Sequence, residues 1–452
     1  MIARVIARYE ALGETAPANA LAAISVGPTN VWDAARYEIA ERLYLRICAE
    51  EAGAAANERA IPTPAPAPLP SPNAPRDPAS LRGAPDVLFA GFLNPSGPCG
   101  LAFAMSALRT EHGALSTVLR HGNMEAEQGL EVCDAESFLR PRDFFSATHT
   151  ASQAHAWMAE VLGEPLGEHL STRKIRRALL HAIAVQRLFD RHEPRVVVIP
   201  DERLFGARAV GLIAKERNIP VLSLPESLEQ LLLRMPPWGR LVSNKMFVLC
   251  AAVRDHLALG GIDPASFGLS GEVYLDAALG YGRRAAPPRD RRTVMFVSQG
   301  LPANRELVPA LRRVVAGLPN TDVIVRPHPK EAPAPDHSPR TQSPLDAIAA
   351  CDVLVTHSSY MALEACLLGC PVVLFDLGPV PHLPLLVSVG AAVRATSEAT
   401  LRQAVEWSLG AGKRAILEAQ GRLRRDIERS SACSSLAAIV HGLAGGQAQP
   451  VP

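Results

Sequence analysis

The chain has 452 residues, more than one hydrophobic core ordinarily holds, so its length favours about two or three domains. Its 46 Lys and Arg against 45 Asp and Glu give a net charge of +1 at pH 7, which excludes the global field that recruits nucleic acid. None of the eight cysteines forms a CxxC pair, which argues against a zinc site or a disulfide framework and favours a reducing cytoplasm.

The N-terminal stretch, residues 1–53, has the spacing of helices. Apolar side chains that can share one helical face are Trp32, Ala35, Ile39, Leu43 and Ile47. We expect a small helical appendage whose apolar stripe packs on a partner helix or on another subunit, which would make the protein a homo-oligomer. The opening MIARVIARYEALGE is charged every few positions, and no stretch approaches about 20 consecutive apolar residues, so we expect neither secretion nor a membrane span.

A composition change separates this appendage from the rest of the chain. Residues 54–84 are rich in Pro and Ala, which favours extended conformers that cannot bury a core, and we interpret them as a linker. Residues 85–280 then alternate apolar runs with helical stretches, which predicts a parallel sheet and a first Rossmann-like domain. The expected strands are 85–92, 195–200, 219–225 and a run from 245, and the expected helices include 101–113 and 205–218.

A second alternation of strands and helices fills residues 293–452, after a polar, basic and proline-bearing connection, YGRRAAPPRDRR. Its expected strands are 293–298, 321–327, 352–357 and 371–376. Its expected helices are 304–318, 343–350, 359–369 and further helices from about 400. In such doubly wound sheets, ligands bind beyond the carboxyl ends of the strands, so we expect the site residues in the loops at that edge.

Three loops of the second domain follow strands and meet at that edge: SQGLP (298–302), RPHPKE (326–331) and THSSYMALEA (356–365). The RPHPKE loop holds three potentially cationic side chains on a stiff turn, and serines at a helix start add hydroxyl and backbone donors. A charge-assisted bond from His328 is worth roughly 1.5 to 3 kcal/mol. The pattern predicts a phosphate site, with the candidate ligands Ser298, Gln299, Gly300, Arg326, His328, Lys330, Ser358 and Ser359.

These residues also carry a resemblance to a known family. RPHP, the Ser-Ser pair and the run E-A-x-x-x-G-C-P-V resemble the HP and SS motifs of bacterial glycosyltransferases with the GT-B fold, which use CMP-activated sialic acid or Kdo. Capsule and teichoic acid polymerases have similar elements. The resemblance implies an α/β GT-B fold, with two Rossmann-like domains facing across a cleft and a small helical appendage. It further implies that His328 and the serines contact the donor phosphate, and that Glu364 lies near the nucleotide ribose.

From this resemblance we expect a cytoplasmic glycosyltransferase that moves an acidic sugar, a sialic acid-like nonulosonate or Kdo, from a CMP-linked donor to a surface glycan or a protein. The chain has no Asp-x-Asp pair to hold a divalent ion, so we expect no cofactor and a metal-independent, inverting reaction. The alternatives are a polysaccharide synthase that uses CDP-glycerol or a UDP-sugar, an isomerase like UDP-N-acetylglucosamine 2-epimerase, and a GT-B protein that binds nucleotide or glycan without turnover.

An inverting displacement needs a base on the acceptor side. Carboxylates that follow expected strands of the first domain are the candidates: Asp201, Glu202 and Glu226. The loop after the first strand holds residues expected to contact acceptor or donor: Asn94, Ser96 and Gly97.

A basic stretch, residues 170–195, has helical spacing and alternates apolar with cationic side chains, among them Arg173, Lys174, Arg176 and Arg177. Two interpretations stay open. These four residues can hold the protein peripherally at the inner membrane face, or the stretch is an ordinary solvated helix of an α/β domain.

Overall fold

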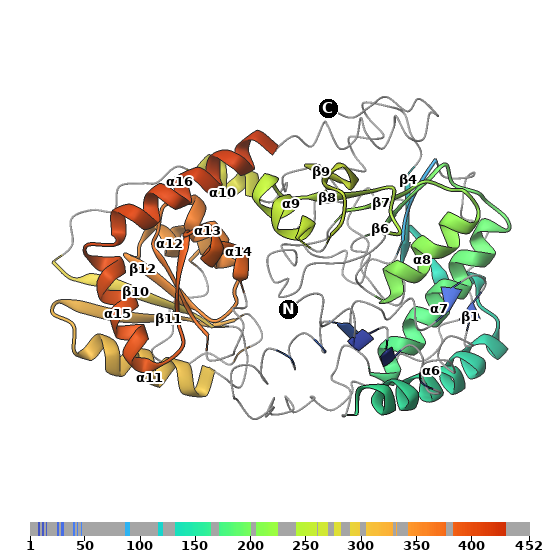
Figure 1. The fold of residues 1–452 in the computed structure, drawn as a ribbon, viewed down its shortest axis with the longest axis horizontal. Coiled ribbons are helices and arrows are strands. Elements are labelled where there is room, and N and C mark those ends of the chain that lie inside the picture. The colour runs from blue at the N-terminus through green and yellow to red at the C-terminus, as the bar shows by residue number, and fades with distance from the viewer. Residues whose placement is uncertain are drawn as a thin grey trace.

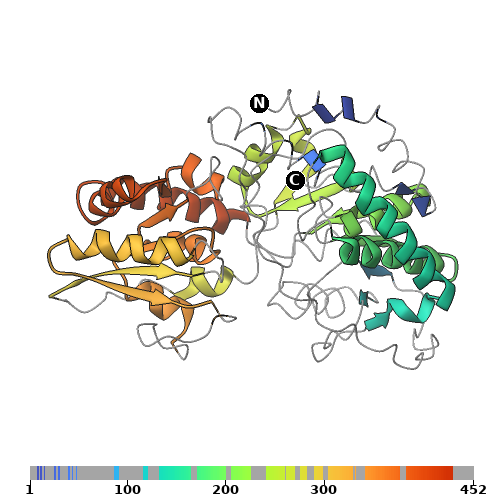
Figure 2. The same cartoon turned by 90° about the horizontal axis from the view of Figure 1, so that it is seen from below.

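The computed structural model shows two α/β halves side by side, each built on one parallel sheet (Figures 1 and 2). All structural statements below refer to the residues that the structure describes. These are 8–9, 11–12, 15, 25–26, 29–30, 39–40, 43, 47, 86–90, 116–120, 132–163, 171–199, 205–224, 241–259, 261–269, 275–281, 290–298, 304–328, 331, 342–376 and 383–430.

The N-terminal half contains a seven-stranded sheet with the order β5-β4-β3-β6-β7-β8-β9, and every neighbouring pair is parallel. The apolar runs expected to form central strands do so, because a parallel sheet covered on both faces buries every side chain. Its strands are β3 (Val87–Phe89), β4 (Ser116–Arg120), β5 (Val132–Asp134), β6 (Val196–Ile199), β7 (Val221–Ser223), β8 (Lys245–Val248) and β9 (Phe267–Leu269).

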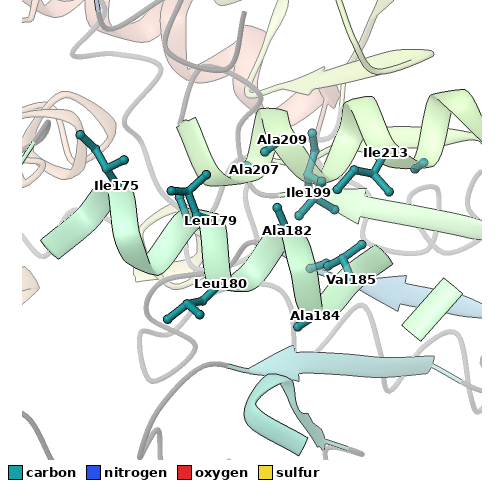
Figure 3. Close-up of a cluster of buried hydrophobic side chains, with 14 of the residues drawn as sticks. Ile175, Leu179, Leu180, Ala182, Ala184, Val185, Ile199, Ala207, Ala209 and Ile213 are labelled. Atoms are coloured by element: carbon teal, nitrogen blue, oxygen red, sulfur yellow. The ribbon is translucent and has the colours of Figure 1, made fainter. Parts of the chain in front are cut away.

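Three long helices cover one face of this sheet. They are α6 (Pro141–Leu162), α7 (Thr172–Phe189) and α8 (Phe205–Glu216), and α7 packs against both of the others. Figure 3 shows Leu179 and Val185 of α7 facing the same cluster as Ile199 of β6 and Ile213 of α8. Helix α9 (Ala251–Ala258) and two 3-10 turns, Ala135–Phe138 and Pro264–Ser266, also belong to this half, while α10 (Leu275–Tyr281) packs against the C-terminal half.

Only parts of the N-terminal appendage lie among the described residues. Ile39, Leu43 and Ile47 are buried, as their shared face predicts, but they belong to the same hydrophobic cluster as α6, α7 and α8. The short antiparallel pair β1 (Ser25–Val26) and β2 (Thr29–Asn30) contacts α7 and α8. The three described residues of the apolar stripe therefore join the core of the first sheet, and packing on another subunit stays a prediction.

Truncating one of these side chains should destabilise the N-terminal half. Leu43→Ala is expected to lower the free energy of unfolding by about 2 to 5 kcal/mol, because a buried leucine leaves a cavity. Leu259→Ala is the matched control, since Leu259 is 68% exposed. Denaturant titration checks this, and equal stability of the two variants would mean that residue 43 lies outside the core.

The C-terminal half contains a five-stranded parallel sheet with the order β11-β10-β12-β13-β14. Its strands are β10 (Arg292–Val297), β11 (Thr321–Arg326), β12 (Val353–Thr356), β13 (Val372–Phe375) and β14 (Ala392–Ala395). Its helices are α11 (Asn304–Ala316), α12 (Pro344–Ala349), α13 (Met361–Leu367), α14 (Pro384–Ser388), α15 (Glu398–Leu409) and α16 (Lys413–Ser430).

Alternate side chains of this sheet enter two different cores, as the two-residue period of a strand requires. Val294 and Phe296 of β10 join a cluster with α11 and α15. Met295 and Val297 join a second cluster with α12, α13, α14 and α16. That second cluster also contains side chains of β8 and α9, so the two halves share one hydrophobic core.

Polar contacts reinforce this joint between the halves, and Figure 1 shows α16 running from the C-terminal sheet toward α9. Asp426 of α16 accepts a hydrogen bond from the backbone N–H of Ala252 at 2.9 Å, which caps the start of α9. Arg424 donates to the carbonyl oxygens of Leu279 at 2.9 Å and Leu367 at 3.0 Å, at the ends of α10 and α13. In the part of the chain that the structure describes, no helix is long and apolar enough to cross a membrane.

Candidate functional site

The C-terminal sheet reverses its winding direction at β10, because β11 lies on one side of that strand and β12 on the other. In doubly wound sheets with this strand order, such a switch point is where ligands bind. The chain leaves β10 at Ser298 and leaves β12 at His357, so two of the three predicted loops begin there. Thr356, which is fully buried, donates its hydroxyl to the carbonyl of Val297 at 3.0 Å and ties the two strand ends together.

The RPHPKE loop is held to the neighbouring strand end by Glu331. Its carboxylate accepts a hydrogen bond from the Ser298 hydroxyl and another from the backbone N–H of His328, at 2.9 Å. The backbone N–H of Glu331 in turn donates to the carbonyl of His328 at 2.9 Å, which closes a tight turn. Glu331 thus fixes the backbone that carries His328, a positioning role that the sequence did not predict.

The Ser-Ser loop differs in detail from its sequence prediction. Helix α13 begins at Met361, two residues later than expected, and the serines lie in the loop before it. Ser359 caps this helix, since its hydroxyl accepts from the N–H of Met361 at 3.3 Å, and its own N–H donates to Thr356 at 3.3 Å. A helix of this length has a weak terminal dipole effect, so hydroxyl groups rather than the helix start carry any phosphate contact.

Arg326, at the end of β11, and Glu364, in α13, carry opposite charges and lie close to each other. No hydrogen bond joins these two side chains. Burial lowers the pKa of Arg326 against the attraction of Glu364, and burial raises the pKa of Glu364 against the attraction of Arg326. Arg326 donates to the carbonyl of Gln342 at 3.0 Å through one nitrogen, Nη2. Its Nη1 atom and Oε2 of Glu364 are buried with no hydrogen-bond partner. Burying a polar atom without a hydrogen-bond partner lowers the stability of the fold. A ligand that forms hydrogen bonds with both atoms would remove this loss of stability.

A histidine and an aspartate that the sequence did not single out for chemistry lie beside this loop. His357 Nδ1 is 3.2 Å from the hydroxyl oxygen of Ser358, and His357 Nε2 is 3.9 Å from a carboxylate oxygen of Asp376. Asp376 is fully buried at the end of β13. Their signal was their position directly after two adjacent buried strands, the same rule that selected the other loops.

The remaining predicted site residues lie outside the described residues, so their roles stay predictions. In the C-terminal half these are Gln299, Gly300 and Lys330. In the N-terminal half they are the base candidates Asp201, Glu202 and Glu226, together with Asn94, Ser96 and Gly97. Within the described ranges, no three or more His, Cys, Asp or Glu side chains converge in a way that could hold a metal ion.

The basic stretch predicted at 170–195 forms α7, which packs between α6 and α8. Of its four predicted cationic contacts only Arg173 is exposed. Lys174, Arg176 and Arg177 are half-buried. A membrane contact through these side chains stays a prediction, and the outer helix on this side is α6 (Figures 1 and 2).

No family model and no curated protein matches the chain. Among solved structures, the calicheamicin glycosyltransferase CalG4 matches with a TM-score of 0.52 and 18% identity, covering 82% of this chain and 100% of that one. The glycotransferase of kitacinnamycin matches with a TM-score of 0.51 and 19% identity, covering 80% of this chain and 99% of that one. Identities this low show the fold alone, and the expected fold is confirmed: the chain has the GT-B architecture of two Rossmann-like halves.

Proposed function

We propose that the protein is a glycosyltransferase that uses a nucleotide-activated sugar, and that its donor site is the edge formed by β10, β11 and β12. The observation that carries this is the pair of orphaned polar atoms on Arg326 and Glu364. A nucleotide sugar supplies both missing partners, since a phosphate oxygen accepts from a guanidinium and a ribose or sugar hydroxyl donates to a carboxylate. Both solved structures named above are glycosyltransferases, which agrees with this assignment.

In this proposal each donor-site residue has one role. Arg326 and His328 neutralise the leaving phosphate, the Ser358 and Ser359 hydroxyls hydrogen-bond it, and Glu364 accepts from a hydroxyl of the donor. His357, between Ser358 and Asp376, orients the Ser358 hydroxyl toward the phosphate. Ser298 acts indirectly by holding Glu331, and the proposed role of Gln299, Gly300 and Lys330 is to contact the same donor.

The transfer step is an inverting displacement. The acceptor hydroxyl oxygen attacks the anomeric carbon of the donor, its proton passes to a carboxylate of the N-terminal half, and the bond from that carbon to the phosphate oxygen breaks. Asp201, Glu202 and Glu226 are the candidate carboxylates. The cationic side chains of the loop after β11 stabilise the negative charge that develops on the leaving phosphate, so the proposed step requires no metal ion.

For the donor itself we propose a CMP-linked acidic sugar, with a glycan or protein as acceptor. The support is the RPHPKE loop, whose Arg326, His328 and Lys330 offer cationic donors both to a phosphodiester and to the carboxylate of an acidic sugar. A UDP-sugar donor would put its second phosphate in that place instead.

A melting-temperature screen against CMP, CDP, UDP and GDP tests the donor proposal. A nucleotide at about 100 times its dissociation constant should stabilise the protein by roughly 2.7 kcal/mol, and CMP is expected to do so. The same mixtures with candidate acceptors are then assayed for sugar transfer. UDP as the sole stabiliser would overturn the CMP assignment, and sugar conversion without any acceptor would identify an isomerase. Nucleotide binding without either reaction would identify a binding protein.

A further inference from the structure

The most exposed aromatic side chain of the described structure is Phe145 of α6, with 79% of its surface exposed, and its neighbour Phe144 is 40% exposed. Two adjacent phenylalanines in water are unusual on a helix whose other face is well buried. Because α6 is the outer helix of the N-terminal half in both views, the rest of the fold leaves this face uncovered (Figures 1 and 2). An exposed aromatic pair of this kind marks a surface that meets a partner.

The charge around this pair is positive. Arg140 and Arg142 flank the start of α6, and both are exposed with no side-chain ion pair among the described residues. Exposed Arg191 lies with its guanidinium carbon 5.6 Å from the centre of the Phe138 ring, directly before the helix.

The one carboxylate in the first turns of α6 is matched mainly by a cation of another helix. Asp143 is buried and forms a two-point ion pair with Arg187 of α7, in which one N–H···O distance is 2.8 Å. The hydrogen bond from Arg187, with smaller contributions from the backbone N–H of Arg140 and the charge of Arg142, keeps the pKa of Asp143 below its ordinary value. The negative charge is therefore buried and matched mainly by Arg187, while the side chains of Arg140 and Arg142 are exposed.

The polar side chains of the same outer face can be removed from water at a small cost in free energy. Thr148 donates its hydroxyl to the carbonyl of Phe144 at 2.7 Å, and Ser152 donates to the carbonyl of Thr148 at 3.0 Å. Their hydrogens are thus already bonded within the helix. From Phe144 to Gln153 no exposed residue is acidic.

We infer that this N-terminal part of α6, defined here as the α6 patch of Arg140, Arg142, Phe144 and Phe145, binds the surface of an anionic lipid bilayer. The phenylalanines enter the interface between headgroups and acyl chains, and the arginines meet the anionic headgroups. We favour a bilayer over a protein partner for two reasons. The patch is the convex outer surface of a helix, and its arginines are not arranged around a site for a carboxylate of a partner protein. This inference does not depend on the proposed catalytic activity.

Sedimentation of the full-length protein with vesicles tests this directly. The protein should bind vesicles of phosphatidylglycerol and phosphatidylcholine, bind weakly to pure phosphatidylcholine, and lose binding as salt is raised. Phe144→Ser with Phe145→Ser should weaken binding about tenfold or more, and Arg140→Gln with Arg142→Gln should weaken it about fivefold for each charge lost.

Matched controls remove equally exposed groups elsewhere. Leu259→Ser removes a side chain that is 68% exposed, and Arg422→Gln with Arg425→Gln removes two exposed cations of α16; both should bind like the wild type. Melting temperatures establish that each variant is folded. No vesicle binding by the wild type, or unchanged binding of the folded double serine variant, would overturn the inference. So would self-association, seen in light scattering, that disappears with the phenylalanines, since the patch would then be a contact between two copies.

Discussion

His328→Ala is expected to lower the rate of sugar transfer by about 10², the scale of losing one preorganised electrostatic contact to a developing charge. The backbone at this position should keep its shape, because Glu331 accepts a hydrogen bond from the backbone N–H of residue 328. The loss should therefore appear in kcat with little change in melting temperature. Turnover with a defined acceptor, measured beside a thermal melt, separates the two quantities.

Two further variants sharpen this test. His328→Gln keeps a hydrogen-bond donor but not the charge, so it should recover only part of the rate. His192→Ala removes a half-buried imidazole after α7 and should leave the rate unchanged. A folded His328→Ala protein with near-normal turnover would contradict the placement of the leaving phosphate beside the β11 loop.

Glu364→Gln is expected to bind nucleotide at least tenfold more weakly and yet to melt at a higher temperature than the wild type. Binding weakens because an amide accepts less strongly than a carboxylate from a donor hydroxyl. Stability rises because burial raises the pKa of Glu364, and the opposing attraction of Arg326 does not cancel that effect. At neutral pH the folded protein thus holds a buried charge that the unfolded chain holds in water.

The pH dependence gives this prediction a second readout. A carboxyl group whose pKa is raised by folding binds more protons in the folded state, so its contribution to stability falls as pH rises from its ordinary 4.5 through the raised value. The melting temperature of the wild type should approach that of Glu364→Gln at acid pH and fall below it at neutral pH. A variant that melts lower at neutral pH and binds nucleotide normally would show that Glu364 serves the fold.

Most of the inner strands were predictable from sequence, whereas the edge strands β5, β9 and β14 were not. β3, β6, β10, β12 and β13 consist mainly of apolar residues because a parallel sheet buries both faces of its inner strands. The edge strand β11 was also predicted, and the inner strand β4 was not. The strands β5, β9 and β14 lie at the sheet edges, have one neighbour each, and carry half-buried or polar positions such as Arg394. An edge strand needs no apolar run, so its sequence lacks the signal that identified the others.

The positions of the loops at the ends of β10, β11 and β12 were predictable, whereas their internal contacts were not. His328, Ser358 and Arg326 could be placed at one sheet edge, because each follows a buried run that ends in the same direction. The contact between His357 and Asp376 depends on the register of β12 and β13, in which Thr356 pairs with Leu374. The role of Glu331 depends on a turn that folds back onto Ser298. Neither register nor turn can be inferred from residue types alone.

Arg424 connects the end of α13 to α10, and this connection bears on how the proposed donor site can move. Its guanidinium joins the carbonyl of Leu279 in α10 to the carbonyl of Leu367 at the end of α13. Helix α13 is a rigid rod of seven residues, about 10 Å long, and Glu364 lies within it. We expect a shift of α10 relative to the C-terminal sheet to push on the end of this helix at Leu367 and to displace Glu364, which lies three residues earlier. Helix α13 would thus act as a lever that couples the position of α10 to binding at the proposed donor site.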